Sequence, residues 1–334
     1  MEQDAGRTTH RTFAASSAIE TGFSHGHQSQ RSRNRDRVMS LSGLALVCLA
    51  LTSCFAAATA APTQTVVSFP VDQQKVVGTL ELPGDMSKPP VVLLLHGFRG
   101  KRDELIIPSV KEGIFARAAN AWAAEGFASL RIDFRGFGDS DGKVEDTTIE
   151  AQIKDALAAV AFLKTQDSVD ASRLFVVGWS WGGAVAAGVA GRSPNPIKGV
   201  ALWAPVSIPA STMAYYLGQD YIYTGLASGG RAVKAKLPEG GFIWLKTPFF
   251  EDLFAFDPVA ELERYSGPVF VAVGNKDTDV KPQPEMGQIL LSYHKGPGEL
   301  WVHPMDHTFN AFENVVTVDA LIAATAAFME KYEK

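Results

Sequence analysis

Apolar positions along the chain follow two different periods, and the two periods alternate. Runs that are almost entirely apolar, at residues 91–95, 174–177 and 268–273, are typical of strands buried on both faces. Residues 115–125 and 148–165 instead repeat their apolar side chains at helical spacing. Because strands alternate with helices, we predict an α/β fold with a mostly parallel central sheet that helices cover on both faces. The same pattern predicts a hairpin at residues 65–71 and 75–82, strands at 128–134, 197–203 and 299–303, and helices at 184–190 and 309–332.

The alternation stops between residues 207 and 263, where aromatic side chains are frequent. Aromatic rings bury a large area and stack on ligands, so we expect an inserted lid in which some rings line a pocket. A plainer interpretation, in which the rings only pack the insertion onto the domain, stays open. The aromatic residues concerned are Tyr215, Tyr216, Tyr221, Tyr223, Phe242, Trp244, Phe249, Phe250, Phe254 and Phe256.

The predicted strand at residues 174–177 runs into Gly178-Trp179-Ser180-Trp181-Gly182, and a helix of small residues follows. Strand, Gly-x-Ser-x-Gly and helix together are the context of a nucleophile elbow, a sharp turn that exposes the serine hydroxyl above the sheet. A side chain on either glycine would collide with the strand or the helix, and the serine backbone is expected to be strained. We therefore predict that Ser180 is a catalytic nucleophile.

An elbow of this kind is followed along the chain by an acid and then by a histidine base. Asp277 follows the strand at residues 268–273, and a carboxylate just past such a strand lies where α/β proteins form ligand sites. Asp277 is the predicted acid, with Asp279 as its competitor. His307, in the loop that enters the last predicted helix, is the predicted base. His303 still belongs to a strand, which favours a packed or hydrogen-bonded histidine.

The charge that develops on the substrate oxygen needs two backbone N–H donors, which form an oxyanion hole. One donor is expected from Trp181, which follows the nucleophile. The other is expected from Phe98 in the loop His96-Gly97-Phe98-Arg99-Gly100, because its glycines let the backbone come close to a substrate. An ordinary glycine turn is the alternative for this loop.

The start of the chain does not share the pattern of the domain. Residues 41–51 form an apolar segment, too short to span a bilayer, after an arginine-rich stretch, which indicates a signal peptide. The run Leu51-Thr52-Ser53-Cys54 resembles a lipoprotein processing site that would lipidate Cys54, whereas Ala58-Thr59-Ala60 would suit ordinary secretion. We therefore expect the protein in the cell envelope, as a lipoprotein or as a periplasmic or secreted protein. The predicted divisions are a leader and signal peptide at 1–54, a linker at 55–63 and a domain at 64–334 with its lid at about 207–263.

Composition excludes several classes of function. The chain has 334 residues and a formal net charge of -5, so no basic excess indicates a nucleic-acid partner. Its cysteines, Cys48 and Cys54, precede the domain, which leaves that domain no disulfide, thiolate nucleophile or cysteine metal site. His303 and His307 have His-x-x-x-His spacing, but Pro304 argues against the helix that a zinc site of that type needs. We predict neither a metal nor a cofactor.

The candidate residues, taken together from about residue 65 to 332, resemble an α/β-hydrolase. The segments that carry this resemblance are His96-Gly97-Phe98, residues 133–140, the elbow, Asp277 and His307. Within that superfamily, residues 133–142 with Thr147-Thr148-Ile149 and Asp155-Ala156 resemble bacterial cinnamoyl and feruloyl esterases. That resemblance implies hydrolysis of esters of small, often aromatic acids without a cofactor. Those esterases usually carry Gln after the nucleophile, whereas Trp181 is closer to the prolyl-oligopeptidase type of elbow, and this difference leaves the substrate open.

The sequence thus predicts an exported serine hydrolase that cleaves carboxylic esters of small molecules. His307 would take the proton of Ser180, the serine would attack an acyl carbon, and water would hydrolyse the acyl-enzyme while Asp277 orients the imidazole. An aminopeptidase or amidase and a hydrolase of carbon–carbon bonds in diketones are the alternatives that the same side chains allow. A non-catalytic binding protein is a further alternative, against which the intact set of side chains argues. Membrane contact is expected only through a lipidated Cys54.

Overall fold

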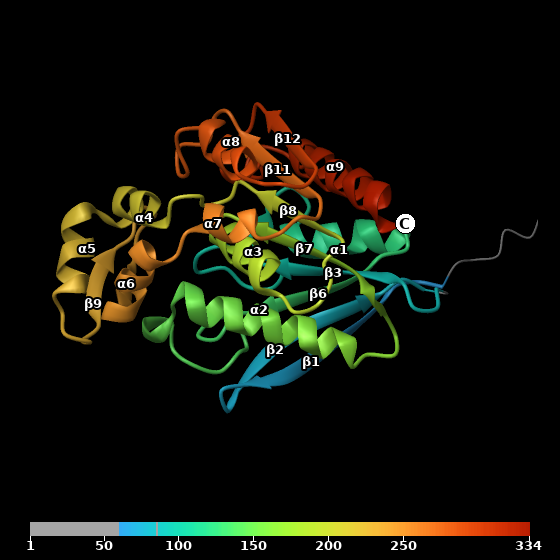
Figure 1. Ribbon diagram of the computed structural model, residues 1–334, viewed down its shortest axis with the longest axis horizontal. Helices are drawn as coiled ribbons and strands as arrows, with labels where there is room; N and C mark the ends of the chain where they lie inside the picture. Colours follow the sequence, from blue (N-terminus) through green and yellow to red (C-terminus); the bar gives the residue numbers. More distant parts are fainter. Residues whose placement is uncertain (1–59, 85) are drawn as a thin grey trace, which may run out of the picture. The chain divides into compact units, whose positions relative to one another are not determined.

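The computed structural model describes residues 60–84 and 86–334, so the predicted leader, the signal peptide, Cys54 and the linker up to residue 59 lie outside the described residues. An eight-stranded sheet forms the framework, in the order β1-β2-β6-β3-β7-β8-β11-β12 (Figure 1). The neighbouring strands from β6 to β12 pair in parallel, and β1 and β2 add an antiparallel hairpin at one edge. The strands of this sheet are β1 (Thr63–Val71), β2 (Gln74–Leu82), β3 (Pro90–Leu95), β6 (Ala128–Asp133), β7 (Asp170–Trp179), β8 (Gly199–Trp203), β11 (Val269–Gly274) and β12 (Gly298–His303).

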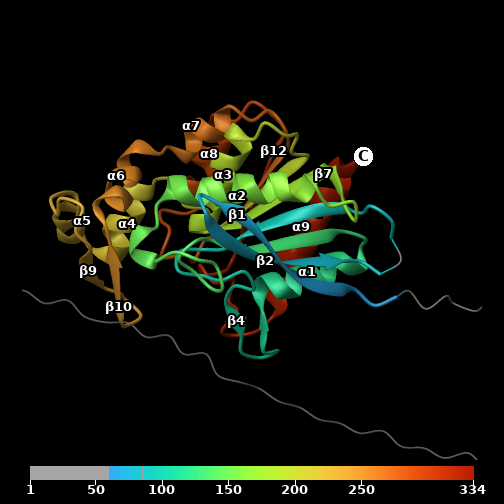
Figure 2. The same cartoon turned by 90° about the horizontal axis from the view of Figure 1, so that it is seen from below.

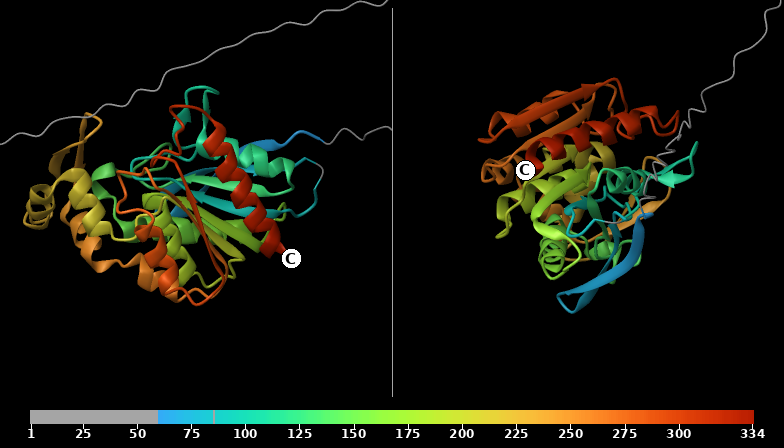
Figure 3. Two further views of the ribbon diagram at one scale, coloured as in Figure 1. Left: turned by 90° about the horizontal axis from the view of Figure 1, so that it is seen from above. Right: turned by 90° about the vertical axis from the view of Figure 1, so that its right-hand side faces the viewer.

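Helices cover both faces of the sheet, as predicted. α2 (Ile149–Lys164), α3 (Trp181–Arg192) and α8 (Glu285–Ser292) pack on one face. α1 (Ile114–Ala124) and α9 (Val316–Glu333) pack on the other, where they lie side by side (Figures 2 and 3). Because helices bury both faces, strands β3 and β11 have no solvent-facing side and are built of apolar residues along their length.

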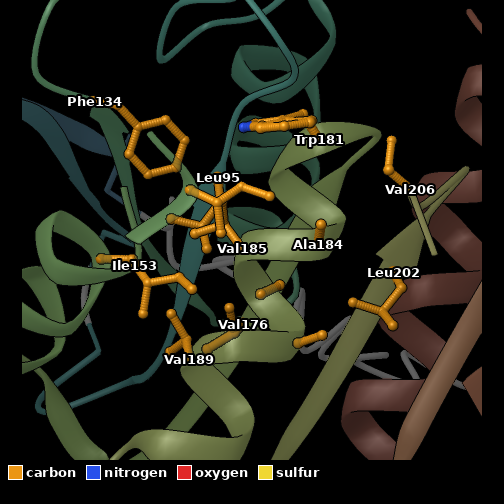
Figure 4. Close-up of a cluster of buried hydrophobic side chains, with 14 of the residues drawn as sticks. Leu95, Phe134, Ile153, Val176, Trp181, Ala184, Val185, Val189, Leu202 and Val206 are labelled. Carbon is orange, nitrogen blue, oxygen red and sulfur yellow. The ribbon is translucent and has the colours of Figure 1, made fainter. Parts of the chain in front are cut away.

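The larger core cluster lies between the sheet and helices α2 and α3, beneath the predicted elbow. Leu95 of β3 and Val176 of β7 lie close to Val185 of α3 and Ile153 of α2 (Figure 4). Each of these side chains is at most 1% exposed. Full burial of one such side chain is worth about 1.5–3 kcal/mol, so the strand that enters the elbow and the helix that leaves it are firmly held.

The closing helix starts later than predicted, and one small hairpin was not predicted. The closing helix was expected from residue 309 but begins at Val316, because Phe309 and Asn310 have positive φ angles of 62° and 56° in a turn before it. The carboxylate of Asp306 stabilises this turn by accepting hydrogen bonds from the backbone N–H groups of Thr308 (2.9 Å) and Asn310 (2.8 Å). A small hairpin of β4 (Ile106–Ile107) and β5 (Glu112–Gly113) was not predicted, since two-residue strands carry no periodicity.

The predicted insertion at residues 207–263 contains two different parts. Its last helix, α7 (Pro258–Glu263), packs against α3 and thus belongs to the body of the domain. The remainder, residues 207–256, lies beyond the end of the sheet at which β7 leads into α3, and we call it the lid (Figure 1). The lid elements are α4 (Pro209–Leu217), α5 (Gln219–Leu226), the hairpin of β9 (Val233–Lys236) and β10 (Phe242–Leu245), and α6 (Thr247–Ala255). Among the described helices, none has the length and the hydropathy needed to cross a membrane.

Candidate active site

Ser180 occupies a strained turn between β7 and α3. Its backbone has φ 55° and ψ -116°, a region that residues other than glycine rarely adopt. The peptide groups around it hold this conformation: the Ser180 N–H donates to the carbonyl of Trp203 (2.8 Å), and the Ser180 carbonyl accepts from the N–H groups of Gly183 and Val206 (3.0 Å each). Strain that the surroundings fix in this way is typical of functional sites.

The glycines on either side of Ser180 are required by close backbone contacts. A Cβ on Gly178 would lie within 2.5 Å of the carbonyl carbon of Gly182, and a Cβ on Gly182 would lie within 2.5 Å of the carbonyl oxygen of His96. Real Cβ atoms do not approach other heavy atoms so closely. The sterically enforced turn predicted from Gly-x-Ser-x-Gly is therefore present.

The structure brings Ser180, His307 and Asp277 together in one hydrogen-bonded chain. His307 Nε2 lies 2.8 Å from Ser180 Oγ, and His307 Nδ1 lies 2.8 Å from Asp277 Oδ2. The second carboxylate oxygen, Oδ1, accepts from the backbone N–H groups of Asp279 (2.8 Å) and Val280 (3.0 Å), which fixes the Asp277 side chain. With an ionised Asp277, Nδ1 donates its proton to the carboxylate, and Nε2 is left to accept the serine proton.

The competing candidates, Asp279 and His303, are not part of this hydrogen-bonded chain. Asp279 is exposed, and it shares with His307 only the wall of one cavity. Its backbone N–H donates a hydrogen bond to Asp277. His303 stacks its ring on that of Trp301, with centroids 4.7 Å apart and planes at 4°, which is the packed role that the strand position favoured.

Two contacts orient the His307 loop. The indole Nε1 of Trp179 donates to the backbone carbonyl of His307 (3.1 Å), and the two rings lie 5.6 Å apart. The turn around Asp306, described above, holds the same loop from the other side. Trp179 belongs to the elbow itself, so the residue before Ser180 positions the histidine that bonds to Ser180.

Both predicted oxyanion donors lie next to Ser180. Trp181 is the first residue of α3, where a backbone N–H has no partner within the helix. No backbone or side-chain acceptor among residues 60–84 and 86–334 takes a hydrogen bond from the Phe98 N–H. A Cβ built on Gly97 would lie only 3.6 Å from the Cβ of Ser180, so the Phe98 loop passes directly beside the serine.

Two titratable side chains lie behind this loop. His96 is fully buried: its Nδ1 lies 2.8 Å from the Gly97 carbonyl, and its Nε2 accepts from the Phe134 N–H (3.1 Å). These partners require a neutral ring with the proton on Nδ1, and burial lowers the pKa of His96 to about 4. Glu104 accepts from the Gly97 N–H (2.8 Å), and burial of its carboxyl group raises the pKa of Glu104 to about 8. Sequence reasoning assigned no role to either residue.

A cavity of about 330 Å³ opens onto Ser180 and His307, and its wall is mostly apolar. The lid supplies Thr212, Met213, Tyr216 and Glu239 to it. Of the predicted lid aromatics, of which some were expected to line a pocket, only Tyr216 lines this cavity. The other lining residues are Gly97, Phe98, Leu105, Trp179, Val206, Asp279, Val280, Thr308 and Phe312. Leu105 and Phe312 were not predicted, because isolated apolar residues in loops give no periodic signal.

The remaining lid aromatics are divided between packing and exposure. Phe249 and Phe250 are at most 1% exposed, and Phe249 stacks on Trp181 with ring centroids 5.6 Å apart. The Trp181 indole also donates to Gln152 Oε1 (2.8 Å), so this side chain joins the elbow helix to the lid and to α2 and does not line the cavity. Phe242 and Trp244 are about half exposed and, together with Arg99, line a separate groove.

The part of the chain that the structure describes contains no group of three or more His, Cys, Asp or Glu side chains placed to hold a metal ion. His303 and His307, which share metal-like spacing in the sequence, have the separate partners described above, Trp301 for one and Ser180 with Asp277 for the other.

Comparison with known proteins places this site in a family context. The family model for serine aminopeptidases (S33) matches residues 91–223. The quorum-quenching protein AidA of Acinetobacter baumannii is 30% identical over 118 residues, which is 35% of this chain and 36% of that protein. The thiohydrolase aneE of Aspergillus aculeatus is 34% identical over 121 residues, 36% of this chain and 35% of that protein. The matched segment thus spans about a third of the length of these relatives.

Solved structures extend the similarity to the whole described domain. Est1E of Butyrivibrio proteoclasticus with ferulic acid bound has a TM-score of 0.65 at 21% identity, covering 80% of this chain and 98% of that one. An α/β-hydrolase, GrgF from a Penicillium species, has a TM-score of 0.63 at 17% identity, covering 81% of this chain and 99% of that one. These likenesses confirm the predicted fold.

Proposed function

We propose that this chain, which has the fold of the α/β-hydrolases, is a serine hydrolase that cleaves carboxylic esters through Ser180, His307 and Asp277. One observation carries the proposal, namely the two successive 2.8 Å hydrogen bonds that link the serine hydroxyl to the imidazole and the imidazole to the carboxylate. A buried Asp277 and a strained Ser180 backbone support the same assignment.

The geometry suits a two-step acyl transfer. His307 Nε2 takes the proton of Ser180 Oγ while the oxygen attacks the carbonyl carbon of the ester, and the N–H groups of Phe98 and Trp181 stabilise the oxyanion. His307 returns the proton to the leaving alkoxide as the ester bond breaks, which leaves an acyl-enzyme. Water, deprotonated by His307, then adds to that acyl carbon, and Ser180 leaves with the returned proton. Asp277 keeps Nδ1 protonated and stabilises the imidazolium in both steps.

The cavity has the size and the lining to hold an apolar acyl or alcohol group of modest size. Its volume of about 330 Å³ lies at the lower end of the range for small-molecule sites, and its lining is largely apolar. The likeness to a structure that holds ferulic acid agrees with a small aromatic acid, and the relative named as a thiohydrolase agrees with acyl-transfer chemistry.

An aminopeptidase is the second candidate, and a specific observation favours it besides the description of the matched family model. Asp279 lines the cavity, is exposed, and forms no ion pair with any residue in the described part of the chain. A free carboxylate beside the nucleophile is the group that would bind the α-amino end of a peptide.

Turnover by the purified domain from Ala61 onward tests both candidates. The substrates are 4-nitrophenyl esters of short and long acids, methyl hydroxycinnamates, and aminoacyl 4-nitroanilides. Ser180→Ala is the blank and should lower ester turnover by about 10³-fold or more, because the nucleophile is lost. A fluorophosphonate probe should label the wild-type domain and not this variant.

The outcomes separate the candidates. Ester turnover that depends on Ser180 and persists in Asp279→Asn supports the esterase. Anilide turnover that collapses in Asp279→Asn supports the aminopeptidase. Turnover that Ser180→Ala retains at the wild-type level contradicts both.

We further propose that the protein is exported and that Cys54 is lipidated, on the evidence of the apolar segment and the Leu51-Thr52-Ser53-Cys54 run. Incorporation of labelled palmitate into the full chain, lost in Cys54→Ala, tests this. Export without label would favour cleavage after Ala60.

A further inference from the structure

The turn from Gly97 to Gly100 is held by hydrogen bonds on its inner side. The Gly97 carbonyl accepts from the Gly100 N–H (3.0 Å) and from His96 Nδ1 (2.8 Å). In a trans peptide the carbonyl and the N–H point in opposite directions, and the N–H opposite this carbonyl belongs to Phe98. The bonds that draw the Gly97 carbonyl inward therefore turn the Phe98 N–H outward.

The carboxyl group of Glu104 fills the inside of this turn. Its Oε2 accepts from the Gly97 N–H at 2.8 Å, so it holds the peptide that precedes the Phe98 peptide. On the other arm of the turn, a Cβ added to Gly100 would come within 2.9 Å of the Glu104 Cδ and even closer to both carboxyl oxygens. The Gly97–Gly100 turn thus surrounds the Glu104 side chain, which accepts a hydrogen bond from one arm of the turn and packs against the other arm.

The segment that carries Glu104 is itself fixed. Glu104 has a φ of 60°, which is unfavourable for a residue with a side chain, and its N–H donates to the Lys101 carbonyl (2.8 Å). On one side, the Arg102 N–H donates to the buried carboxylate of Asp133 at 2.7 Å. On the other, the carbonyl of Asp103 accepts from the N–H of Phe115 in α1 at 3.1 Å. These attachments make the carboxyl a fixed support for the turn.

We propose that Glu104 is a positioning residue for the oxyanion hole: its carboxyl oxygen, by accepting from Gly97 and filling the Gly97–Gly100 turn, aims the Phe98 N–H at the oxygen of the reacting carbonyl. This inference rests on the proposed function, because it gives the Phe98 N–H the role of oxyanion donor. Glu104 does not itself line the cavity and makes no hydrogen bond with Ser180, so it acts only through Gly97 and the loop.

The inference predicts which kinetic constant changes. Hydrogen bonds to the oxyanion strengthen as charge develops, so a misaimed donor raises the barrier without weakening the ground-state complex. Loss of one entire oxyanion donor costs about 10²–10³ in kcat, and a donor that is displaced but present should cost less, about 10- to 100-fold.

Two variants that keep a sizeable side chain separate the hydrogen-bond acceptor from the bulk of the side chain. Glu104→Leu fills the turn but accepts no hydrogen bond, whereas Glu104→Gln keeps an oxygen that accepts from Gly97. Glu112→Leu is the control, because Glu112 lies in the neighbouring β5 and pairs with Arg117 (3.0 Å) and Asn120 (2.7 Å), away from the turn. The readouts are kcat and KM for 4-nitrophenyl butyrate and inhibition by a trifluoromethyl ketone, which adds to serine and places an oxyanion in the hole.

We expect Glu104→Leu to lower kcat by about 10- to 100-fold and to leave KM within about twofold of the wild-type value. The inhibition constant of the ketone should rise by the same factor by which kcat/KM falls. Glu104→Gln should stay within about threefold of the wild type, and Glu112→Leu should match the wild type.

Three results would overturn the inference: an unchanged kcat in Glu104→Leu, an equal loss in the Leu and Gln variants, or a rise in KM as large as the fall in kcat. A wild-type protein without Ser180-dependent turnover would instead overturn the proposed function, so the two failures are distinguishable.

Discussion

The elbow with its surrounding loops and the lid face the same cavity, yet they are built in opposite ways. Around Ser180, hydrogen bonds join the side chains of Ser180, His307 and Asp277, and a Cβ on Gly182 would run into the main chain of the neighbouring strand. In the lid, a Cβ on Gly229 or Gly240 would meet no atom within 4 Å, and Phe254 is 62% exposed.

The contrast separates two tasks. Hydrolysis needs groups held within a few tenths of an ångström, and the loops at the end of the sheet supply that precision through buried hydrogen bonds. The cavity wall supplied by the lid includes the side chains of Met213 and Tyr216, which make no hydrogen bond with Ser180, His307 or Asp277. We infer that the elbow and its surrounding loops determine which reaction is catalysed, and that the lid determines which substrates are accepted.

The sharpest test of the elbow side compares two aspartates that are two residues apart. Asp277→Asn should lower kcat by about 10⁴-fold, because an amide no longer fixes the imidazole tautomer or stabilises the imidazolium. Asp279→Asn should stay within about threefold for neutral esters, because its side chain makes no contact with His307 Nδ1. Steady-state kinetics of both variants on one ester measure the two losses in kcat. Similar losses in the two variants would show that the assignment of Asp277 as the acid is wrong.

The difference between the elbow and the lid also explains how much of the site could be predicted from the sequence. Ser180, Asp277 and His307 could be selected as candidates because each follows a strand whose apolar run is visible, and the turn at Ser180 requires local glycines. Glu104 was missed because its contact with Gly97 depends on the chain folding back on itself, which no local pattern records. The cavity-lining member of the lid aromatics could not be chosen, since Tyr216 and Phe249 differ only in where the tertiary packing places them.

A second comparison tests the attachment of the lid, with two phenylalanines of α6. Phe249 is 1% exposed and contacts the rings of Phe98 and Trp181, so Phe249→Ala should lower the free energy of unfolding by about 3–5 kcal/mol. Phe254 is 62% exposed, and Phe254→Ala should change it by less than about 0.5 kcal/mol. Urea unfolding provides the measurement. Equal effects would mean that the lid is not held to the elbow through this ring cluster.

A third prediction concerns the pH dependence of stability on the elbow side. The ordinary pKa of the Glu104 carboxyl is 4.5, and burial raises it to about 8 in the folded protein. Between these values the folded state binds more protons than the unfolded state, so the contribution of Glu104 to stability is present below pH 4.5 and is lost as the pH rises toward 8. Glutamine does not titrate.

Wild-type protein should therefore lose stability relative to Glu104→Gln between about pH 5 and pH 8. His96 has the opposite sign, because burial lowers its pKa to about 4, but it is present in both proteins and cancels in the difference. Urea unfolding of both proteins at several pH values gives that difference, and a constant value would show that the Glu104 carboxyl titrates normally.

The smallest expected effect lies where the two regions meet. Glu239, in the turn between β9 and β10, pairs with Arg99 of the Gly97–Gly100 turn and accepts a hydrogen bond from the Tyr216 hydroxyl (2.9 Å). That hydroxyl stays protonated because burial raises the pKa of Tyr216 to about 12. The Glu239 side chain is 50% exposed and that of Arg99 is 32% exposed, and such pairs are worth about 0–1 kcal/mol. Glu239→Gln should therefore speed hydrogen exchange in the lid hairpin by about fivefold at most.

Salt distinguishes an ion pair at this contact from mere packing. Raising the ionic strength toward 1 M shortens the screening length to about 3 Å, so wild-type hairpin exchange should approach that of Glu239→Gln, whose own exchange should not respond. Glu251→Gln, an exposed carboxylate of α6 without an ion pair among the described residues, is the matched control and should behave as the wild type at every salt concentration. A hundredfold increase in exchange for Glu239→Gln would show that this single contact, and not the aromatic cluster around Phe249, fastens the lid to the elbow.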